Sequence, residues 1–157
     1  MKLLTRTLAI AAIAGSSACL GVTDSNPAIP IENTTFASSL GVNLAASTKT
    51  TNGAYYRDLV VGTGPVIASG QTLSVRYSGW LSNGTLFDSN VNLTNAYSFK
   101  FGVREVIDGW DEALAGIRVG GQRQLIVPPQ LAYGPYGNGP IPPNAVLVFT
   151  VEVLDAR

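Results

Sequence analysis

Histidine is absent from the 157 residues of this chain, and Cys19 is the only cysteine. Without histidine, the chain lacks the commonest general base and the commonest metal ligand, and no Ser-His or Cys-His nucleophilic pair can form. One cysteine cannot make an intramolecular disulfide or a zinc site built from several thiolates. The sequence therefore predicts no metal ion and no cofactor, and any catalysis must proceed without a histidine base.

Charge is also scarce. Only 13% of the residues are charged, and ten Lys and Arg balance ten Asp and Glu, so we expect no basic surface for a nucleic acid partner. Hydrophobic residues make up 46% of the chain, which is enough for one packed core. Seventeen glycines and nine prolines indicate many turns, and this favours a sheet-rich fold over a helical bundle.

The N-terminal residues have the pattern of a targeting segment. Lys2 and Arg6 precede an apolar run at 8–14, and small residues follow at 15–18. The run is about seven residues long, far short of the roughly 20 needed to span a bilayer. We interpret residues 1–18 as a secretory signal peptide, which predicts an exported protein in the periplasm or anchored at the outer membrane.

Two ways of processing this signal remain open. The pattern resembles a bacterial lipoprotein signal, in which Cys19 would be lipidated and would anchor the chain to the membrane. Ser16 stands where that motif usually has leucine. The alternative is ordinary cleavage after Ala18, with small residues at both positions that matter for cleavage. A lipid anchor at Cys19 is the only membrane contact that we expect.

Residues 19–52 are rich in Ser, Thr, Asn, Ala and Gly and carry few charges, as is typical of a flexible tether. Phe36, Leu40, Val42 and Leu44 interrupt this composition, and the last three alternate. They fit either a linker with scattered apolar residues or an arm that docks on its own domain or on a second copy. A compact domain is predicted over residues 53–157.

Hydrophobic periodicity within this domain predicts an α+β fold. Period-two patterns favour strands near 55–61, 71–81, 85–87, 97–101, 123–127 and 146–154. Ile107, Trp110, Leu114 and Ile117 instead share one face of a short helix, which we expect the glycines at 120–121 to end. The sum is an antiparallel sheet of about five strands wrapped on this helix.

Two connections and the last predicted strand carry further structural signals in the sequence. The pair at 83–84, Asn-Gly, is typical of a type I′ hairpin, in which both residues have positive φ. In 146–154, alternation places Leu147, Phe149 and Val151 on one face and Val146 and Val148 on the other. The segment 128–144 is too rich in Pro and Gly for a helix or strand, so it forms either an ordered functional loop or a floppy one.

Several motifs together resemble the FKBP family of peptidyl-prolyl cis/trans isomerases. In chain order they are VRYSGWL at 75–81, NG at 83–84, FDS at 87–89, EVIDGW at 105–110, LAYG at 131–134 and IPPNAVLVF at 141–149. The resemblance covers residues 53–157 and leaves 1–52 uncovered. It implies an FKBP-like fold and prolyl isomerase activity.

The resemblance also implies an apolar cavity for proline. Its catalytic residues would be Tyr77, Phe87, Asp88, Ile107, Trp110, Tyr133 and Phe149, and its further substrate-binding residues Tyr97, Val106 and Ile141. Trp110 would be the floor, and the Ile107 N–H and the Tyr133 hydroxyl would donate hydrogen bonds to peptide carbonyls. Taken one by one, these aromatic residues would equally suit a packed core.

Two positions depart from familiar members of the family. Some members have an arginine five residues beyond the aspartate, where this chain has Leu93, so Asp88 is expected to lack a cationic partner. From its position alone, Asp88 could equally be a turn residue. The loop before Ile141 is one residue shorter than in a familiar single-domain member, with Pro140 in front of it, and this affects the expected affinity for macrolides.

The predicted function is acceleration of X-Pro bond rotation in exported proteins by an apolar aromatic pocket that favours the twisted amide. No proton needs to be abstracted, so the reaction suits a chain without histidine. The expected partners are proline-containing peptides, unfolded exported proteins and macrolides such as rapamycin. The alternative is a non-catalytic proline-peptide binding or chaperone module on the same fold.

Overall fold

A computed structural model of the chain describes residues 27–157. Three 3-10 helices, η1 (Ile31–Asn33), η2 (Ser38–Leu40) and η3 (Leu44–Ala46), precede the sheet. Its strands are β1 (Thr48–Lys49), β2 (Tyr55–Val60), β3 (Thr72–Leu81), β4 (Leu86–Ser89), β5 (Tyr97–Lys100), β6 (Gln122–Val127) and β7 (Leu147–Ala156). The α-helix α1 (Asp108–Ala113) follows β5, and η4 (Pro129–Leu131) and η5 (Gly134–Tyr136) lie between β6 and β7. No helix in this part of the chain is long and apolar enough to cross a membrane.

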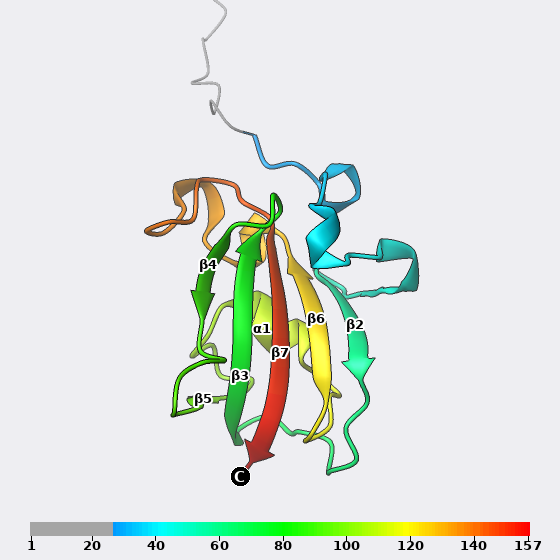
Figure 1. Ribbon diagram of the computed structural model, residues 1–157, viewed down its shortest axis with the longest axis vertical. Coiled ribbons are helices and arrows are strands. Elements are labelled where there is room, and N and C mark those ends of the chain that lie inside the picture. The colour runs from blue at the N-terminus through cyan, green and yellow to red at the C-terminus, as the bar shows by residue number, and fades with distance from the viewer. Residues whose placement is uncertain (1–26) are drawn as a thin grey trace, which may run out of the picture.

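The seven strands form one antiparallel sheet in the order β1-β2-β6-β7-β3-β4, with β5 also paired to β3. Helix α1 lies behind the sheet in Figure 1. The predicted α+β fold is confirmed. Strands β2 to β7 match the six predicted segments, whereas the two-residue strand β1 was not predicted. Strands β4 and β5 pair with successive parts of β3 on the same side.

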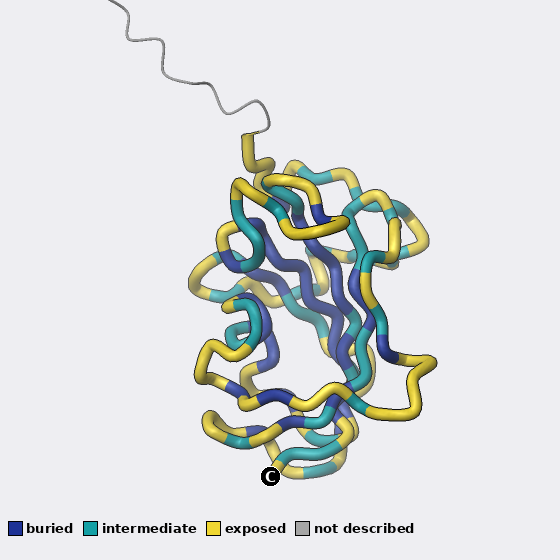
Figure 2. Tube along the Cα trace, turned by 90° about the vertical axis from the view of Figure 1, so that its left-hand side faces the viewer, coloured by how far each residue is buried: buried dark blue, intermediate teal, exposed yellow. Residues whose placement is uncertain are grey.

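The core lies between the sheet and α1. Leu147, Phe149 and Val151 of β7 are buried against Trp110 and Leu114, as their alternation predicts. Buried residues follow the strands as a band, whereas exposed residues lie mainly in the loops (Figure 2). The sheet therefore buries one face fully, and α1 is the cover that a single apolar sheet face requires.

Two local predictions were wrong. Helix α1 ends at Ala113, well before Gly120, and Leu114 is its C-terminal cap. Leu114 and Ile117 are buried all the same, because the turn after the helix keeps them facing the core. In the hairpin between β3 and β4, Gly84 has φ 89° and Asn83 does not have positive φ, so the turn is not type I′.

The segment before the domain adopts the docked alternative. Ile31, Tyr55, Ile126, Val146 and Val148 form a second apolar cluster on the other face of the sheet. The four apolar residues singled out in the sequence, Phe36, Leu40, Val42 and Leu44, pack against this cluster. We call residues 31–44 the arm; in Figure 1 it lies beside β6 and β2, in blue and cyan.

The segment 128–144 is ordered. Two 3-10 helices, η4 and η5, occupy its first half. Asn138 and Ile141 form a bridge with N–H to carbonyl distances of 2.9 Å in both directions, and the Asn144 N–H donates to the Gly134 carbonyl at 2.9 Å. These bonds fold the loop back on itself, so that it holds a fixed shape above one end of the sheet.

Candidate active site

A cavity of about 440 Å³ opens between α1, the inner face of the sheet and the 128–144 loop. Its lining residues are Tyr77, Phe87, Asp88, Tyr97, Glu105, Val106, Ile107, Trp110, Tyr133 and Phe149. They come from β3, β4, β5, β7, α1 and the loops beside them. Thus residues spread over more than 70 positions of the chain converge on one apolar pocket.

The structure differs from the sequence-based site at two positions. Ile141 does not line the cavity; its side chain is 6% exposed and belongs to the main core. Its apolar character predicted burial, but could not tell whether it faces the cavity or the core. Glu105 lines the cavity and was not predicted. It stands directly before Val106 and Ile107 in the motif that marked α1, and this was the available signal.

Trp110 forms the floor of the cavity. Its side chain is 4% exposed, and ring centroids lie 5.2 Å away in Tyr77, 5.4 Å away in Phe149 and 5.6 Å away in Phe99, all edge-on. Edge-to-face packing is a favoured aromatic geometry. Helix α1 can approach β6 this closely because Gly109 has no side chain, and a Cβ there would collide with Val127.

The phenyl rings of Phe87 and Phe149 form one wall. Their centroids are 5.6 Å apart and their planes are at 89°. Gly79 lies beneath them on β3, where an added Cβ would stand 2.7 Å from Phe87 and 2.8 Å from Phe149. Gly79 therefore makes room for the wall. It occurs in the VRYSGWL motif, but sequence reasoning gave it no role.

Asp88 and Tyr77 form the polar rim. The Tyr77 hydroxyl donates to Oδ2 of Asp88 at 2.6 Å. Burial, and then this hydrogen bond to the carboxylate, raise the pKa of Tyr77 well above its ordinary value. No ion pair of Asp88 occurs within residues 27–157. Oδ1 therefore remains available to a ligand.

Asn90 fixes the chain where the β4 and β5 strands separate. Its side chain is 5% exposed, accepts the Tyr77 N–H at 2.7 Å and donates to the Val75 carbonyl at 3.0 Å. It thereby takes the place of strand pairing along the middle of β3. As a result Asp88 and Tyr97 are held on either side of Tyr77. Sequence reasoning missed Asn90, because one polar residue after a strand reads as an ordinary turn.

Two hydrogen-bond donors in the cavity have no partner within the described part of the chain. They are the Ile107 N–H, at the N-terminal cap of α1, and the Tyr133 hydroxyl. Burial is the largest cause of a raised pKa for Tyr133, followed by the charge of Asp88, so the hydroxyl keeps its proton. Trp110 Nε1 is buried without a partner as well. The cavity can therefore donate hydrogen bonds to a ligand's carbonyl groups.

The segment that leads into α1 is held by the helix itself. The Asp111 carboxylate accepts the N–H groups of Gly102 and Arg104 at 2.9 and 3.0 Å. These bonds fix the approach to Glu105, Val106 and Ile107. In the described part of the chain, no group of His, Cys, Asp and Glu could hold a metal ion.

Comparison with known proteins decides the family. A model of the FKBP-type peptidyl-prolyl cis-trans isomerases matches residues 64–154, which is more than half of the chain. The chain belongs to the FKBP family of peptidyl-prolyl cis-trans isomerases.

Named relatives agree with this assignment. The chain is 50% identical over 104 residues to "FK506-binding protein 4" of Dictyostelium discoideum, covering 66% of this chain but only 28% of that protein. It is 43% identical over 103 residues to "FK506-binding protein" of Neisseria meningitidis serogroup B, covering 65% of this chain and 94% of that one. The FKBP domain thus makes up nearly all of one relative and about a quarter of the other.

Solved structures show the same fold. The crystal structure of AtFKBP13 matches with a TM-score of 0.66 at 37% identity, over 71% of this chain and 98% of that one. FkpA from Escherichia coli matches with a TM-score of 0.66 at 38% identity, over 71% of this chain and 52% of that one. Cys19 and the predicted signal at 1–18 lie outside the described residues.

Proposed function

We propose that this FKBP accelerates cis/trans rotation of X-Pro peptide bonds, with the proline ring on Trp110. The observation that carries the proposal is the pairing of an aromatic cavity with two free donors, the Ile107 N–H and the Tyr133 hydroxyl. An X-Pro segment presents carbonyl groups on both sides of an apolar ring, and this matches that arrangement.

The chemistry requires no base. Rotation about the peptide C–N bond has a barrier of about 18–20 kcal/mol, because resonance is lost as the bond twists. The planar amide is more polar than the twisted one, so an apolar pocket favours the twisted amide relative to the planar ground state. Each reduction of about 1.4 kcal/mol in the barrier gives a tenfold increase in rate.

The polar rim would orient the peptide. With Tyr77 donating to Oδ2 of Asp88 at 2.6 Å, the carboxylate is held in one position at the edge of the cavity. It can then stabilise the dipole of an amide that rotates beneath it. The donors at Ile107 and Tyr133 would hold the carbonyls that do not rotate, so that rotation is confined to the bond before proline.

The substrates we propose are unfolded proteins that have left the cytoplasm. This rests on the signal pattern at residues 1–18 and on Cys19, which would carry a lipid anchor if the chain is processed as a lipoprotein. FK506-type macrolides and rapamycin would compete for the same cavity. The names of several relatives describe them as FK506-binding, and aromatic rings line the cavity here.

A proline-isomerisation assay tests the proposal. The chain without residues 1–18 is added to a short Leu-Pro peptide, with and without rapamycin, and the cis-to-trans rate is measured. We expect acceleration that rapamycin abolishes. Peptide binding without acceleration would instead support the alternative of a non-catalytic binding module. If the chain neither binds the peptide nor accelerates its isomerisation, both the proposed function and the binding-module alternative are wrong.

A further inference from the structure

We propose that the arm, residues 31–44, positions the two loops that frame the cavity. It does so by joining the β3–β4 hairpin to the far end of the 128–144 loop. The tests that measure kcat/KM rest on the proposed isomerase activity, whereas the test by hydrogen exchange does not. The arm itself packs on the face of the sheet opposite the cavity, and it precedes residues 64–154, the stretch that matches the family.

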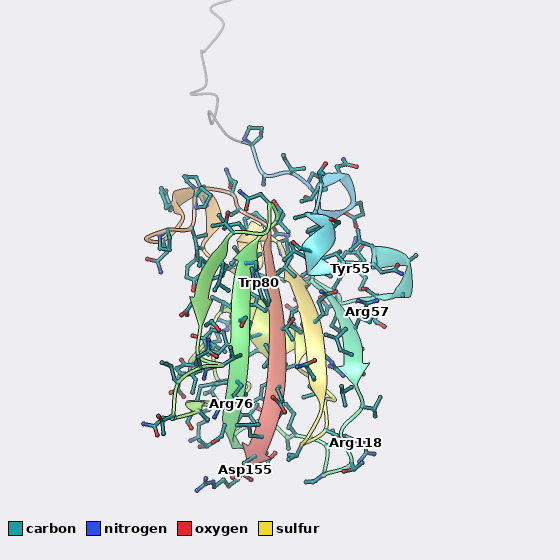
Figure 3. All side chains as sticks on the ribbon, viewed as in Figure 1. Tyr55, Arg57, Arg76, Trp80, Arg118 and Asp155 are labelled. Atoms are coloured by element: carbon teal, nitrogen blue, oxygen red, sulfur yellow. The ribbon has the colours of Figure 1, made fainter. Side chains whose placement is uncertain are left out.

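The arm is anchored firmly to the sheet. The Glu32 carboxylate accepts hydrogen bonds from Lys49 Nζ at 2.6 Å and from the Tyr55 hydroxyl at 2.5 Å. Farther along, Gln124 Nε2 donates to the Leu40 carbonyl at 2.7 Å and Arg57 donates to the Gly41 carbonyl at 2.8 Å. Figure 3 shows Tyr55 and Arg57 on the arm's side of β2.

From this base the arm reaches the hairpin. The Ala37 N–H donates to the Ser82 carbonyl at 2.8 Å. Packing is close as well, since a Cβ added to Gly84 would lie 3.1 Å from that of Ala37 and 3.3 Å from Ser39 Oγ. The hairpin leads directly into β4, which carries Phe87 and Asp88. The hydrogen bond from Ala37 therefore links the arm to the hairpin that leads to one wall of the cavity.

The arm also reaches the loop on the other side. Ile31 is 2% exposed and shares its apolar cluster with Val146, the residue just before β7. Two residues earlier, the Asn144 N–H donates to the Gly134 carbonyl at 2.9 Å, and Gly134 follows Tyr133. The chain of contacts thus runs from Ile31 to the loop that carries the donating hydroxyl.

The hairpin and the loop lie side by side next to the arm. A groove of about 220 Å³ is lined by Ile29 and Thr34, by hairpin residues 81–83 and by loop residues 142–146. The β3–β7 pairing ends at Leu81 and Leu147, so residues 82–83 and 142–146 lie beyond the last strand pair. Supporting contacts of this kind set how accurately a site is held, so release of the arm would let Asp88 and Tyr133 shift relative to Trp110.

Substitution of Ala37 isolates the proposed contact. Ala37→Pro removes the N–H, and the native φ of −59° already suits a proline ring. Ala37→Gly is the matched control, because it keeps the N–H. We expect Ala37→Pro to lower kcat/KM about threefold to tenfold, the effect of one hydrogen bond, while Ala37→Gly keeps wild-type activity.

A second pair of variants separates positioning from stability. Ile31→Ala and Ile67→Ala make the same change at buried sites, 2% and 5% exposed, but Ile67 lies in the main core beside the bridge of Val66 and Arg118. Both should lower the melting temperature. Only Ile31→Ala should lower kcat/KM at a temperature far below unfolding. Equal effects on kcat/KM would overturn the proposal.

Hydrogen exchange provides a measurement that does not depend on catalysis. In Ala37→Pro, the amides of Gly84 and Asn144 should exchange faster, whereas that of Leu125 in β6 should not change. Unchanged exchange at Gly84 and Asn144 would overturn the proposal even if activity fell. If the wild-type chain has no isomerase activity, the proposed function fails, and this exchange result alone still decides the role of the arm.

Discussion

The hydroxyl of Tyr77 and the carboxylate of Asp88 are joined by a 2.6 Å hydrogen bond across the rim of the cavity. The two residues lie on neighbouring strands, and Gly79 rather than Tyr77 is the register partner of Asp88. The bond therefore runs diagonally across the pair of strands. It holds the carboxylate over the cavity without the help of a cation.

Removal of single polar groups should reduce activity only moderately. Tyr133→Phe loses one neutral hydrogen bond, worth about 0.5–1.5 kcal/mol, and Asp88→Val loses a charged partner, worth about 1.5–3 kcal/mol. We expect kcat/KM on a Leu-Pro peptide to fall about tenfold or less for the first and further for the second. Circular dichroism checks the fold. A loss beyond about a thousandfold would indicate a catalytic base and contradict the apolar-pocket mechanism.

Trp110→Ala should damage both stability and activity. The ring is 4% exposed and contacts three other aromatic rings, and loss of a buried aromatic side chain typically costs about 3–5 kcal/mol. Urea unfolding and the peptide assay measure the two effects. Trp110→Phe is the control and should recover part of both. A Trp110→Ala variant with the melting temperature and turnover of the wild type would show that Trp110 contributes neither to stability nor to activity.

Gly79→Ala should disturb the wall of the cavity more than the fold. The added methyl would stand within 3 Å of both Phe87 and Phe149, and forcing an extra methyl into a packed region costs about 1–3 kcal/mol. The Cβ of Gly121→Ala would instead stand 2.8 Å from the Arg118 carbonyl oxygen, and neither residue lines the cavity. At matched loss of stability, peptide affinity should fall in Gly79→Ala and stay unchanged in Gly121→Ala.

Activity should be nearly independent of pH around neutrality. The chain has no histidine, and the pKa values of Tyr77 and Tyr133 are raised, mainly by burial. Both hydroxyls therefore stay protonated beyond the usual tyrosine range, and kcat/KM should be flat between about pH 6 and 8, where only histidine normally titrates. A bell-shaped profile in this window, with the fold intact, would show that another ionisable group takes part.

Acid should release the arm. Hydrogen bonds from Lys49, and then from Tyr55, lower the pKa of Glu32 from 4.5 to about 2. Since the folded pKa is depressed, the stabilisation is fully present above the ordinary value and is lost as the pH falls toward 2. The melting temperature of Glu32→Gln should therefore lie below that of the wild type at pH 7 and approach it near pH 2. Asp155→Asn, at an exposed ion pair with Arg157, should show a smaller difference at pH 7.

Much of the fold could be predicted because alternation is a strong local signal. In residues 146–154 it assigned Phe149 and Val151 to one face and Val146 and Val148 to the other, as observed. What covers the second face could not be predicted. Residues such as Leu40 are too widely spaced to distinguish an arm from a linker, and the contact depends on strands far away in the sequence.

The mistaken predictions have a common cause. The spacing of Leu114 and Ile117 fits a helix face, but burial fixes only where the side chains point, and a turn satisfies it equally well. Asn83 tolerates positive φ, yet in this hairpin only Gly84 has it. For Ile141, the motif gave the residue type, whereas the side it faces depends on how the 128–144 loop folds.

The position of β7 has a consequence for how the chain reaches its native state. This strand lies between β3 and β6, although it is the last of the seven strands along the chain. When the chain appears with its N-terminus first, the core cannot close until β7 has appeared. Strand pairings between residues as distant in sequence as those of β3 and β7 also form slowly. Until then, the isomerase cavity lacks the wall that Phe149 provides, and the chain itself is an unfolded protein with prolines in it.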